Sequence, residues 1–260
     1  EDIAFKYVYP KEYKEVFEIT DLFYSIFDIP YRFRLGTRPE KYMGDIETWN
    51  RAEKELKEIL EESGKEYFIQ EGNGAFYGPK VDILMKDAIG RDWQMGTIQL
   101  DFQIPRNFKL TYAAADGSQK TPVVVHRVIY GSLERFIGIL IEHFAGNFPT
   151  WLAPVQVIVL PIADRHLEYA QEVNLNLTSA GIRSEVDGRS EKLGAKIRDA
   201  QMQKIPYMLI IGDKEMENQQ VAVRSRDSGD LGVMALPKLL EDLKIEIGQK
   251  KLTKKVAETI

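Results

Sequence analysis

The chain has 260 residues and a formal net charge of -5, so it is not a protein that coats nucleic acid through a uniformly basic surface. It contains no cysteine, which excludes disulfides and thiolate metal sites. No apolar run approaches the roughly 20 residues of a membrane-spanning helix, and the acidic N-terminus resembles neither a signal nor a transit peptide. We therefore expect a cytoplasmic protein that does not enter a membrane.

The first half of the chain predicts helices mixed with strands of alternating polarity. Residues 10–27 and 45–64 place apolar side chains at helical spacing, and Gly64 closes the second helix. The strand candidates are YRFRLG (31–36), KVDILMKD (80–87), RDWQMGTIQLDF (91–102) and TPVVVHR (121–127). Their period of two predicts an antiparallel sheet covered on one face by helices.

The pattern changes after Pro154. VQVIVLPI (155–162) is continuously apolar, as in a strand buried on both faces. The segments that follow are a helix at 164–179, the strand IRSEVDG, a helix from 191, the strands PYMLIIGD and VAVRSR, and a helix from 236. This alternation predicts a small α/β domain with a mostly parallel sheet. FPTWLAP is the predicted join, which places the domains at residues 1–152 and 153–260.

One arginine lies on the strongly apolar helix within HRVIYGSLERFIGILIEHFAGNFPTWLAP (126–154). The predicted buried stripe of this helix is Leu133, Phe136, Ile137, Leu140, Ile141 and Phe144. Arg135 lies on the opposite stripe, with Gly131 and Gly138 one turn to either side. Flanking glycines would leave room for a flat ligand or a phosphate on the guanidinium. The alternative is a helix packed closely on another backbone, with Arg135 in a salt bridge.

Polar residues on two other segments are candidates for binding a small ligand. Tyr77 and Lys80 lie in a loop that leads into a strand, and Gln94, Thr97 and Gln99 lie on the next strand. Amides on the inner face of a strand cost free energy unless they have partners, so they suit a polar ligand. The alternative is a surface strand with solvated amides.

Together these segments resemble the class II aminoacyl-tRNA synthetases, in the version typical of the threonyl-tRNA synthetases. Residues 126–157 resemble the family's third signature motif, and TRPEKYMGD, AFYGPKVDI, WQMGTIQLDF and PYMLIIGDKE are similar to segments of the threonyl enzymes in the same order. The resemblance covers the chain except for roughly its first thirty residues. It implies part of an α+β, antiparallel-sheet class II catalytic core, followed by a small α/β anticodon-binding domain.

The resemblance also implies roles for single residues. Arg135 matches the motif 3 arginine, which stacks on adenine and holds the phosphates of ATP, with Mg²⁺ as the accompanying ion. The implied ATP-binding residues are Arg135, Gln94, Thr97 and Ser132, and the implied threonine or adenylate pocket is Tyr77, Lys80, Gln94 and Gln99. The implied reaction is the ATP-dependent activation of threonine and its transfer to tRNA(Thr), EC 6.1.1.3.

His126 matches the third zinc ligand of the family, in which Zn²⁺ holds the amino and hydroxyl groups of threonine. Taken alone, a single histidine is more often structural than a ligand. The family site needs a cysteine and a second histidine, whereas this chain has no cysteine, and His143 and His166 lie elsewhere in it. Because one protein ligand does not make a zinc site, we expect Zn²⁺ in the complete family enzyme and not in this chain.

In the second half, Lys204, Glu215 and Arg224 match positions that contact the anticodon, and Ser190 replaces the usual asparagine of that site. The alternative is that Glu215 and Arg224 simply pair with each other on the surface. A cluster of basic residues on or just after one helix also predicts phosphate contacts; its members are Lys192, Lys196, Arg198 and Lys204.

Two parts of the family pattern are not found in this sequence. The first is motif 2, whose arginine clamps the α-phosphate. The second is motif 1, which builds the homodimer. We therefore expect an inactive fragment of a threonine–tRNA ligase that begins after motif 2, with threonine and tRNA(Thr) as partners and no DNA. The alternative is a non-catalytic paralogue that acts as a tRNA-binding or regulatory module, although the intact motif 3 favours the ligase.

Overall fold

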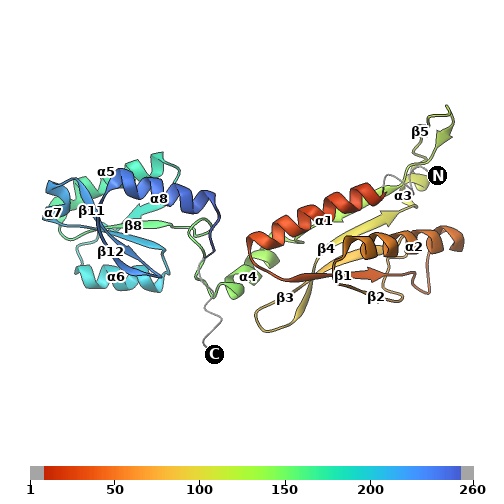
Figure 1. The fold of residues 1–260 in the computed structure, drawn as a ribbon, viewed down its shortest axis with the longest axis horizontal. Helices are drawn as coiled ribbons and strands as arrows, with labels where there is room; N and C mark the ends of the chain where they lie inside the picture. The colour runs from red at the N-terminus through yellow and green to blue at the C-terminus, as the bar shows by residue number, and fades with distance from the viewer. Residues whose placement is uncertain (1–8, 253–260) are drawn as a thin grey trace. The chain divides into compact units, whose positions relative to one another are not determined.

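Two separate five-stranded sheets form the frame of the protein, one in each half of the chain (Figure 1). The computed structural model describes residues 9–252, and the chain divides into the units Glu1–Ile139 and Leu140–Ile260. Within the described residues, no helix is both long enough and apolar enough to cross a membrane. The domain boundary predicted at residue 152 stays a prediction.

The first unit combines helices with a mostly antiparallel sheet. Its helices are α1 (Tyr9–Ile26), α2 (Ile46–Ser63), α3 (Ile104–Asn107) and the first part of α4 (Leu133–His143). Its sheet has the order β2-β1-β3-β4-β7, with β1 (Tyr31–Gly36), β2 (Tyr67–Gln70), β3 (Lys80–Lys86), β4 (Asp92–Asp101) and β7 (Val124–Val128). Only β1 and β2 pair in parallel in this sheet. The predicted helices and the four predicted strands are confirmed, whereas β2 and the hairpin of β5 (Tyr112–Ala113) and β6 (Gln119–Lys120) were not predicted.

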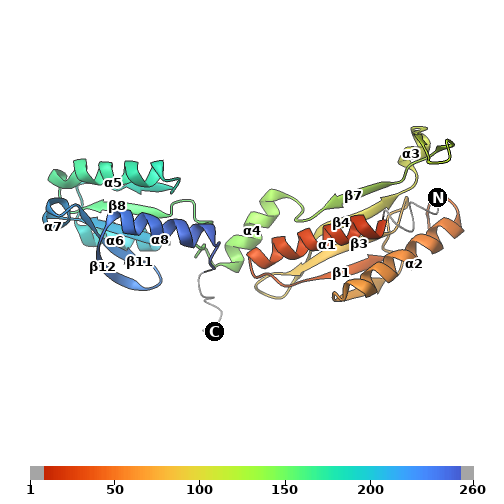
Figure 2. The same cartoon turned by 45° about the horizontal axis from the view of Figure 1, so that its top comes forward.

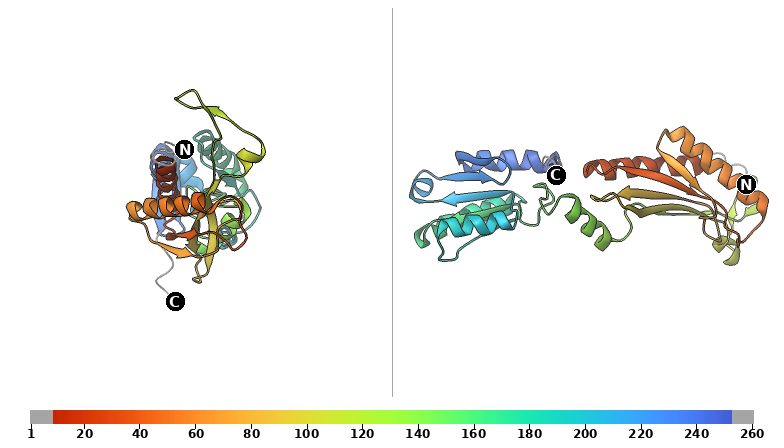
Figure 3. Two further views of the ribbon diagram at one scale, coloured as in Figure 1. Left: turned by 90° about the vertical axis from the view of Figure 1, so that its right-hand side faces the viewer. Right: turned by 90° about the horizontal axis from the view of Figure 1, so that it is seen from below.

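The helices α1 and α2 cover one face of this sheet (Figures 2 and 3). The ring of Phe17 on α1 lies 4.4 Å from the ring of Phe33 on β1, and α2 adds the buried Trp49. The side chain of Asp45 caps the first turn of α2, and Gly64, with a φ of 65°, ends the helix in a left-handed conformation that suits glycine. The apolar residues of the strands face these helices, which leaves the opposite face to polar residues.

The apolar helix α4 buries only part of the stripe that the sequence predicts, and it buries Ile139, which lies outside that stripe. Phe136, Ile139 and Leu140 are buried, with 5% of each residue exposed. The exposed members of the predicted stripe are Leu133 (57%), Ile137 (45%) and Ile141 (49%). The aromatic ring of Phe136 packs on the rings at the end of α1, and this contact fixes which side of the helix is buried.

The second unit has a mixed sheet with the order β12-β11-β10-β8-β9. Its strands are β8 (Val157–Pro161), β9 (Ser184–Val186), β10 (Tyr207–Ile211), β11 (Gln220–Ser225) and β12 (Gly229–Ala235). Its helices are the 3₁₀ helix η2 (Asp164–His166), α5 (Leu167–Ser179), α6 (Leu193–Met202), α7 (Asp213–Glu217) and α8 (Leu236–Gly248). β8 pairs in parallel with β9 and β10, but β11 pairs antiparallel with β10 and β12. The mostly parallel sheet that we predicted is therefore wrong on this side, because β11 runs opposite to β10 and to β12 and pairs antiparallel with both.

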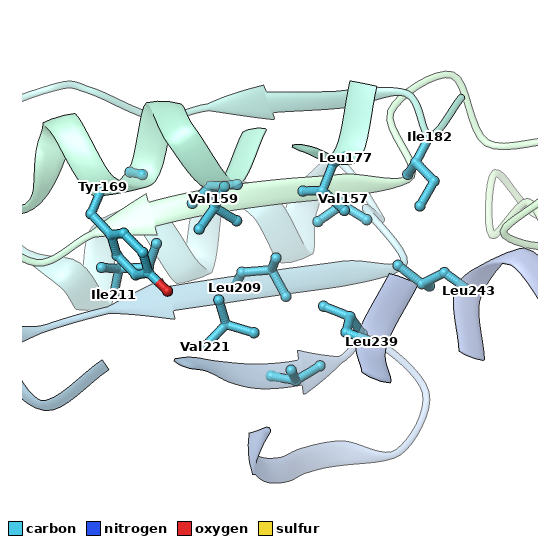
Figure 4. Packing of buried hydrophobic residues seen from close by; sticks show 13 residues of the cluster. Val157, Val159, Tyr169, Leu177, Ile182, Leu209, Ile211, Val221, Leu239 and Leu243 are labelled. Atoms are coloured by element: carbon cyan, nitrogen blue, oxygen red, sulfur yellow. The ribbon is translucent and has the colours of Figure 1, made fainter. Parts of the chain in front are cut away.

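Helices cover both faces of the second sheet. On one face Val157, Val159 and Leu209 pack against α5 and α8 (Figure 4). On the other face Ile158 and Met208 pack against α6. Alternate residues of the central strands are thus buried on opposite sides, which explains their continuous apolar sequence. Polar binding groups have no place in the middle of this sheet and must lie at the ends of its strands.

Candidate functional site

The free face of the first sheet gathers polar side chains from three neighbouring strands. Asp82 of β3 pairs with Thr97 of β4, and Lys80 pairs with Gln99. His126 of β7 pairs with Gln99 from the other side. Directly opposed residues of antiparallel strands point to the same face. The sheet therefore brings Asp82 together with four residues that the sequence predicts for the site, which are Lys80, Thr97, Gln99 and His126.

A bulge in β4 adds Gln94 to this face. Ile83 pairs with Gly96, whereas Leu84 pairs with Gln94, so Met95 is an extra residue in the strand. An extra residue reverses the alternation of side chains, and Gln94 therefore reaches the same face as Thr97. The sequence did not reveal this irregularity.

Asp82 is a buried carboxylate that holds several of these residues in place. Its side chain is fully buried, and its Oδ2 lies 2.6 Å from Arg34 Nη2 and 3.0 Å from Lys80 Nζ. Its Oδ1 accepts hydrogen bonds of 2.8 Å from Gln94 and from Thr97. A carboxylate removed from water is stable only among cations and donors, so Asp82 fixes three residues of the predicted pocket. Sequence reasoning missed Asp82 and Arg34, although a single acid in the apolar strand KVDILM was a visible signal.

Gln99 has an unpaired donor in the same place. Only 8% of this residue is exposed, and its Oε1 accepts a 3.0 Å hydrogen bond from the hydroxyl of Tyr77. Its Nε2 is buried and has no hydrogen-bond partner among residues 9–252. Tyr77 reaches this position because Gly78 lets the loop approach β4: a Cβ on Gly78 would lie 1.8 Å from the carbonyl oxygen of Leu100. An unpaired buried N–H costs about 1–3 kcal/mol, and an acceptor on a bound ligand would remove that cost.

Arg135 is exposed at the start of α4 and forms no ion pair within residues 9–252. Its Nη1 donates to the carbonyl oxygen of Gln94 at 3.3 Å, and its Cζ lies 5.6 Å from the centre of the Trp93 ring. The indole N–H of Trp93 donates in turn to Asp87 at 2.8 Å. Burial raises the pKa of Asp87, but the hydrogen bonds from Trp93 and Arg91 outweigh burial and hold the pKa well below its usual range. The guanidinium of Arg135 is therefore oriented by an aromatic ring while its charge stays uncompensated.

The two glycines near Arg135 have different roles. Gly131 lies before the helix with a φ of 71°, and a Cβ there would lie 2.7 Å from the carbonyl oxygen of Met95. Its predicted place on the stripe of the helix is therefore wrong. Gly138 lies inside α4 and has no atom within 4 Å of an added Cβ, which leaves room on the helix. Ser132 accepts the backbone N–H of Arg135 at 3.3 Å and so supports the first turn.

His126 lies beside one other potential metal ligand. Its Nε2 is 3.0 Å from Oδ2 of Asp101, a buried carboxylate that sequence reasoning missed. Burial raises the pKa of Asp101, but hydrogen bonds from Ile104 and His126 hold it below its usual range. In the described part of the chain no three histidine, aspartate or glutamate residues gather as a metal site, and the chain has no cysteine. This donor set does not fit the four-coordinate zinc of a protein site, so we assign no step to zinc.

The residues predicted to contact the anticodon lie at two ends of the second sheet. Ser190 follows the carboxyl end of β9, and Glu215 follows that of β10. Lys204 precedes β10, and Arg224 pairs with Met208 near the start of that strand. The structure thus places Ser190 and Glu215 at the carboxyl ends of the parallel strands β9 and β10, and Lys204 and Arg224 toward the opposite ends of the strands.

Arg224 is half-buried, and its Nε is buried without a hydrogen-bond partner in the part of the chain that the structure describes. In the described structure Arg224 forms no ion pair with Glu215. The Oε2 of Glu215 instead accepts the N–H of Gly212 at 3.0 Å. The alternative of a Glu215–Arg224 surface pair is therefore not found. Lys204 donates from its Nζ to the carbonyl oxygen of Ala145, so its charge is directed to a loop of its own unit.

Lys196 does not belong to a phosphate-binding cluster, and this part of the prediction is wrong. Only 3% of Lys196 is exposed. Its Nζ donates to the carbonyl oxygens of Pro161 and Asp187, both at 3.0 Å. These two hydrogen bonds connect the carboxyl ends of β8 and β9 through the ammonium group of Lys196. Because the group is buried, it cannot reach an RNA phosphate. Lys192 and Arg198 of the predicted cluster remain exposed.

Family models match both units of the chain. The tRNA synthetase class II core domain (G, H, P, S and T) matches residues 7–144, and the anticodon binding domain matches residues 156–256. The chain belongs to the class II tRNA synthetases. The predicted recognition and fold class are confirmed. The poor match expected for the first thirty residues is wrong, because the class II match begins at residue 7 and includes the whole of α1.

The curated relatives are threonine–tRNA ligases. That of Natranaerobius thermophilus is 52% identical over 237 residues, and that of Clostridium tetani is 56% identical over 236 residues. Each match covers 91% of this chain but 37% of the relative, so the chain spans well under half of their length. The RNA binding domain of threonyl-tRNA synthetase from Cryptosporidium parvum Iowa II has a similar crystal structure. Its TM-score is 0.86 at 35% identity, over 91% of this chain and 60% of that one.

Proposed function

We propose that this chain is the part of a threonine–tRNA ligase (EC 6.1.1.3) that binds ATP, threonyl-adenylate and the anticodon of tRNA(Thr). One observation carries the catalytic half of the proposal. The buried Nε2 of Gln99 lacks a partner on the same polar face that Asp82 organises, and the uncompensated Arg135 is bonded to the bulge of that face. The names of the relatives support threonine as the amino acid and tRNA(Thr) as the acceptor.

In the proposed reaction, the carboxylate of threonine attacks the α-phosphate of ATP. Pyrophosphate leaves, and threonyl-adenylate then passes its threonyl group to the 3′-terminal adenosine of the tRNA. Arg135 would bind adenine or phosphate charge, and Gln99 and Tyr77 would orient the adenylate by hydrogen bonds. Mg²⁺, which class II synthetases use with ATP, would supply charge on the phosphates. The residues of this chain thus act by positioning and not by covalent chemistry.

The non-catalytic alternative is a tRNA-binding module. The incomplete donor set at His126 supports it, because amino-acid selection by the metal has no basis in this chain. The exposed Arg135 and the unpaired Gln99 support the ligase instead, since a module that binds only RNA needs neither. A homodimer of the complete enzyme and a cytoplasmic location remain predictions.

Titration calorimetry with a non-hydrolysable threonyl-adenylate analogue tests the catalytic half. We expect the full chain to bind the analogue and Gln99→Ala to weaken binding about tenfold, the effect of one buried hydrogen bond. Gln103→Ala is a matched control, because Gln103 is also buried (9% exposed) but lies after β4. Absence of binding by the wild-type chain, or equal effects of the two substitutions, would favour the non-catalytic module. We expect no threonine-dependent pyrophosphate exchange by the chain alone.

A further inference from the structure

Three consecutive polar residues follow the carboxyl end of β8, in the short helix η2. Arg165 makes two hydrogen bonds to Asp213, from Nε to Oδ1 at 2.8 Å and from Nη2 to Oδ2 at 2.7 Å. His166 lies 2.9 Å from the same Oδ1 through its Nε2. Asp213 is the first residue of α7 and stands two positions before Glu215. The turn after β8 is therefore connected to the helix that carries a predicted anticodon contact.

The environment of His166 determines which of its ring nitrogens carries the proton. The residue is buried, with 1% exposed, and its Nδ1 accepts the backbone N–H of Ala163 at 3.2 Å. A nitrogen that accepts a hydrogen bond carries no proton, so the proton of the neutral ring is on Nε2 and points at Asp213. The hydrogen bonds from Arg165 and His166 hold the pKa of Asp213 well below its usual range. Asp213 is thus a carboxylate held by oriented donors.

Backbone contacts join the same two turns. The N–H of Ile162 donates to the carbonyl oxygen of Ile211 at 2.9 Å. A Cβ on Gly212 would lie 2.9 Å from Cδ1 of Ile162 and 3.1 Å from Oε2 of Glu215, so the two turns lie close together at this residue. The N–H of Gly212 donates to Oε2 of Glu215 at 3.0 Å. One oxygen of Glu215 is therefore held by the turn, while Oε1 has no partner within the described residues.

We propose that Arg165 and His166, acting through Asp213, position Glu215 so that its free oxygen accepts a hydrogen bond from the amino group of an unpaired RNA base. RNA sequence is read on the exposed edges of unpaired bases, and carboxylates accept from base amino groups. The same turn reaches Ser190, whose Oγ donates to Asp164 at 3.3 Å. Arg165 and His166 are positioning residues and do not contact the base. This inference rests on the proposed tRNA function and adds the device that sets its selectivity.

Two substitutions of His166 separate its two hydrogen bonds. His166→Gln keeps an N–H donor near the position of Nε2 but removes the acceptor for Ala163. His166→Asn keeps an acceptor near Nδ1 but removes the donor to Asp213. The full chain is titrated with a tRNA(Thr) anticodon stem-loop and with loops changed at one anticodon base. We expect His166→Asn to reduce the preference for the cognate loop about tenfold and His166→Gln to retain most of it.

The outcomes distinguish the inference from the function on which it rests. A wild-type chain that shows no preference for the cognate loop would overturn the proposed tRNA function. If the wild type discriminates but both His166 variants lose the preference, His166 only supports the fold, and if both keep it, His166 has no role. Arg165→Gln provides a test that does not depend on a buried site, because Arg165 is exposed. We expect it to reduce the preference without reducing the affinity for a non-cognate loop, and an unchanged preference would overturn the positioning role.

Discussion

The two sheets of this protein place their binding groups in different positions. The sheet of the first unit is covered by α1 and α2 on one face, and polar side chains lie in the middle of its strands on the other. The sheet of the second unit is covered on both faces, and its candidate groups lie at strand ends. A one-sided sheet can use its face as a site, whereas an α/β sheet covered by helices presents ligands at its edge.

The position of a polar group also determines what holds it. Asp82, in the middle of a strand, has no exposed side-chain surface and depends on four neighbouring side chains. Asp213, at a strand end, keeps 55% of its side chain exposed and is solvated as well as paired. Losing a partner inside the sheet should therefore cost much more stability than losing one at its edge.

The largest effect is expected for Asp82→Ala. The substitution leaves Arg34 and Lys80 without the buried anion between them, and removing one member of a buried ion pair costs about 3–5 kcal/mol. Urea unfolding followed by tryptophan fluorescence measures the loss. Asp213→Ala is the matched control at a strand end, and we expect a much smaller change from it. Equal losses would show that the two sheets hold their carboxylates in the same way.

Lys196 is the exception in the second unit, because it is a buried cation near strand ends. Lys196→Ala would leave the carbonyl oxygens of Pro161 and Asp187 without their donor, at about 1–3 kcal/mol each. We expect a lower unfolding midpoint in urea and, below the transition, an unchanged affinity for RNA. Lys192→Ala, at an exposed residue, should show the reverse: normal stability and weaker binding of all RNAs. Weaker RNA binding by a folded Lys196→Ala chain would contradict the structural role.

Arg224→Ala tests whether the opposite edge of the second sheet takes part in RNA binding. Arg224 is half-buried and forms no ion pair with Glu215 in the described residues, so the part of its guanidinium that solvent reaches can contact an RNA base. We expect a loss of about 1–3 kcal/mol in affinity for the tRNA(Thr) anticodon stem-loop and weaker discrimination at one base. Filter binding with cognate and altered loops measures both. Unchanged affinity and preference would confine the site to the edge that carries Glu215.

Much of the fold could be predicted because the two units follow different periodicities. The alternation in YRFRLG, KVDILM and WQMGTIQLDF identifies β1, β3 and β4, and the apolar VIVLP identifies β8. β2 has only four residues, and β12 contains two glycines, so neither gives a clear pattern. The sheet is mixed because β11 runs opposite to both of its neighbours, and strand patterns do not reveal the direction in which a strand runs.

The candidate site could be predicted only where single residues carry the signal. Arg135 and Gln99 were visible in the sequence, but the bulge at Met95 arises from pairing with β3. The rotation of α4 could not be fixed from the sequence, because its apolar residues occupy more than one stripe and the buried Ile139 lies outside the predicted one. The burial of Lys196 could not be predicted, because it depends on the carbonyl oxygens of Pro161 and Asp187, which only the folded strands bring to its Nζ.

The smallest expected effect compares two helical glycines, one in each unit. Neither Gly138 in α4 nor Gly194 in the first turn of α6 has any atom within 4 Å of an added Cβ. Alanine should therefore fit at both positions and stabilise each helix by up to about 1 kcal/mol, since glycine is the poorer helix former. Urea unfolding of the two single variants measures this gain.

Ligand binding separates the two glycines. Gly138 lies one turn from Arg135, so a methyl group there would project toward a nucleotide stacked on the guanidinium. We expect Gly138→Ala to weaken binding of the threonyl-adenylate analogue severalfold while it stabilises the chain, and Gly194→Ala to stabilise without any effect on that binding. A stability gain with unchanged binding in both variants would mean that the open space beside Gly138 is not used by the ligand. The nucleotide would then lie over the strands alone, and the face of the first sheet would suffice as the site.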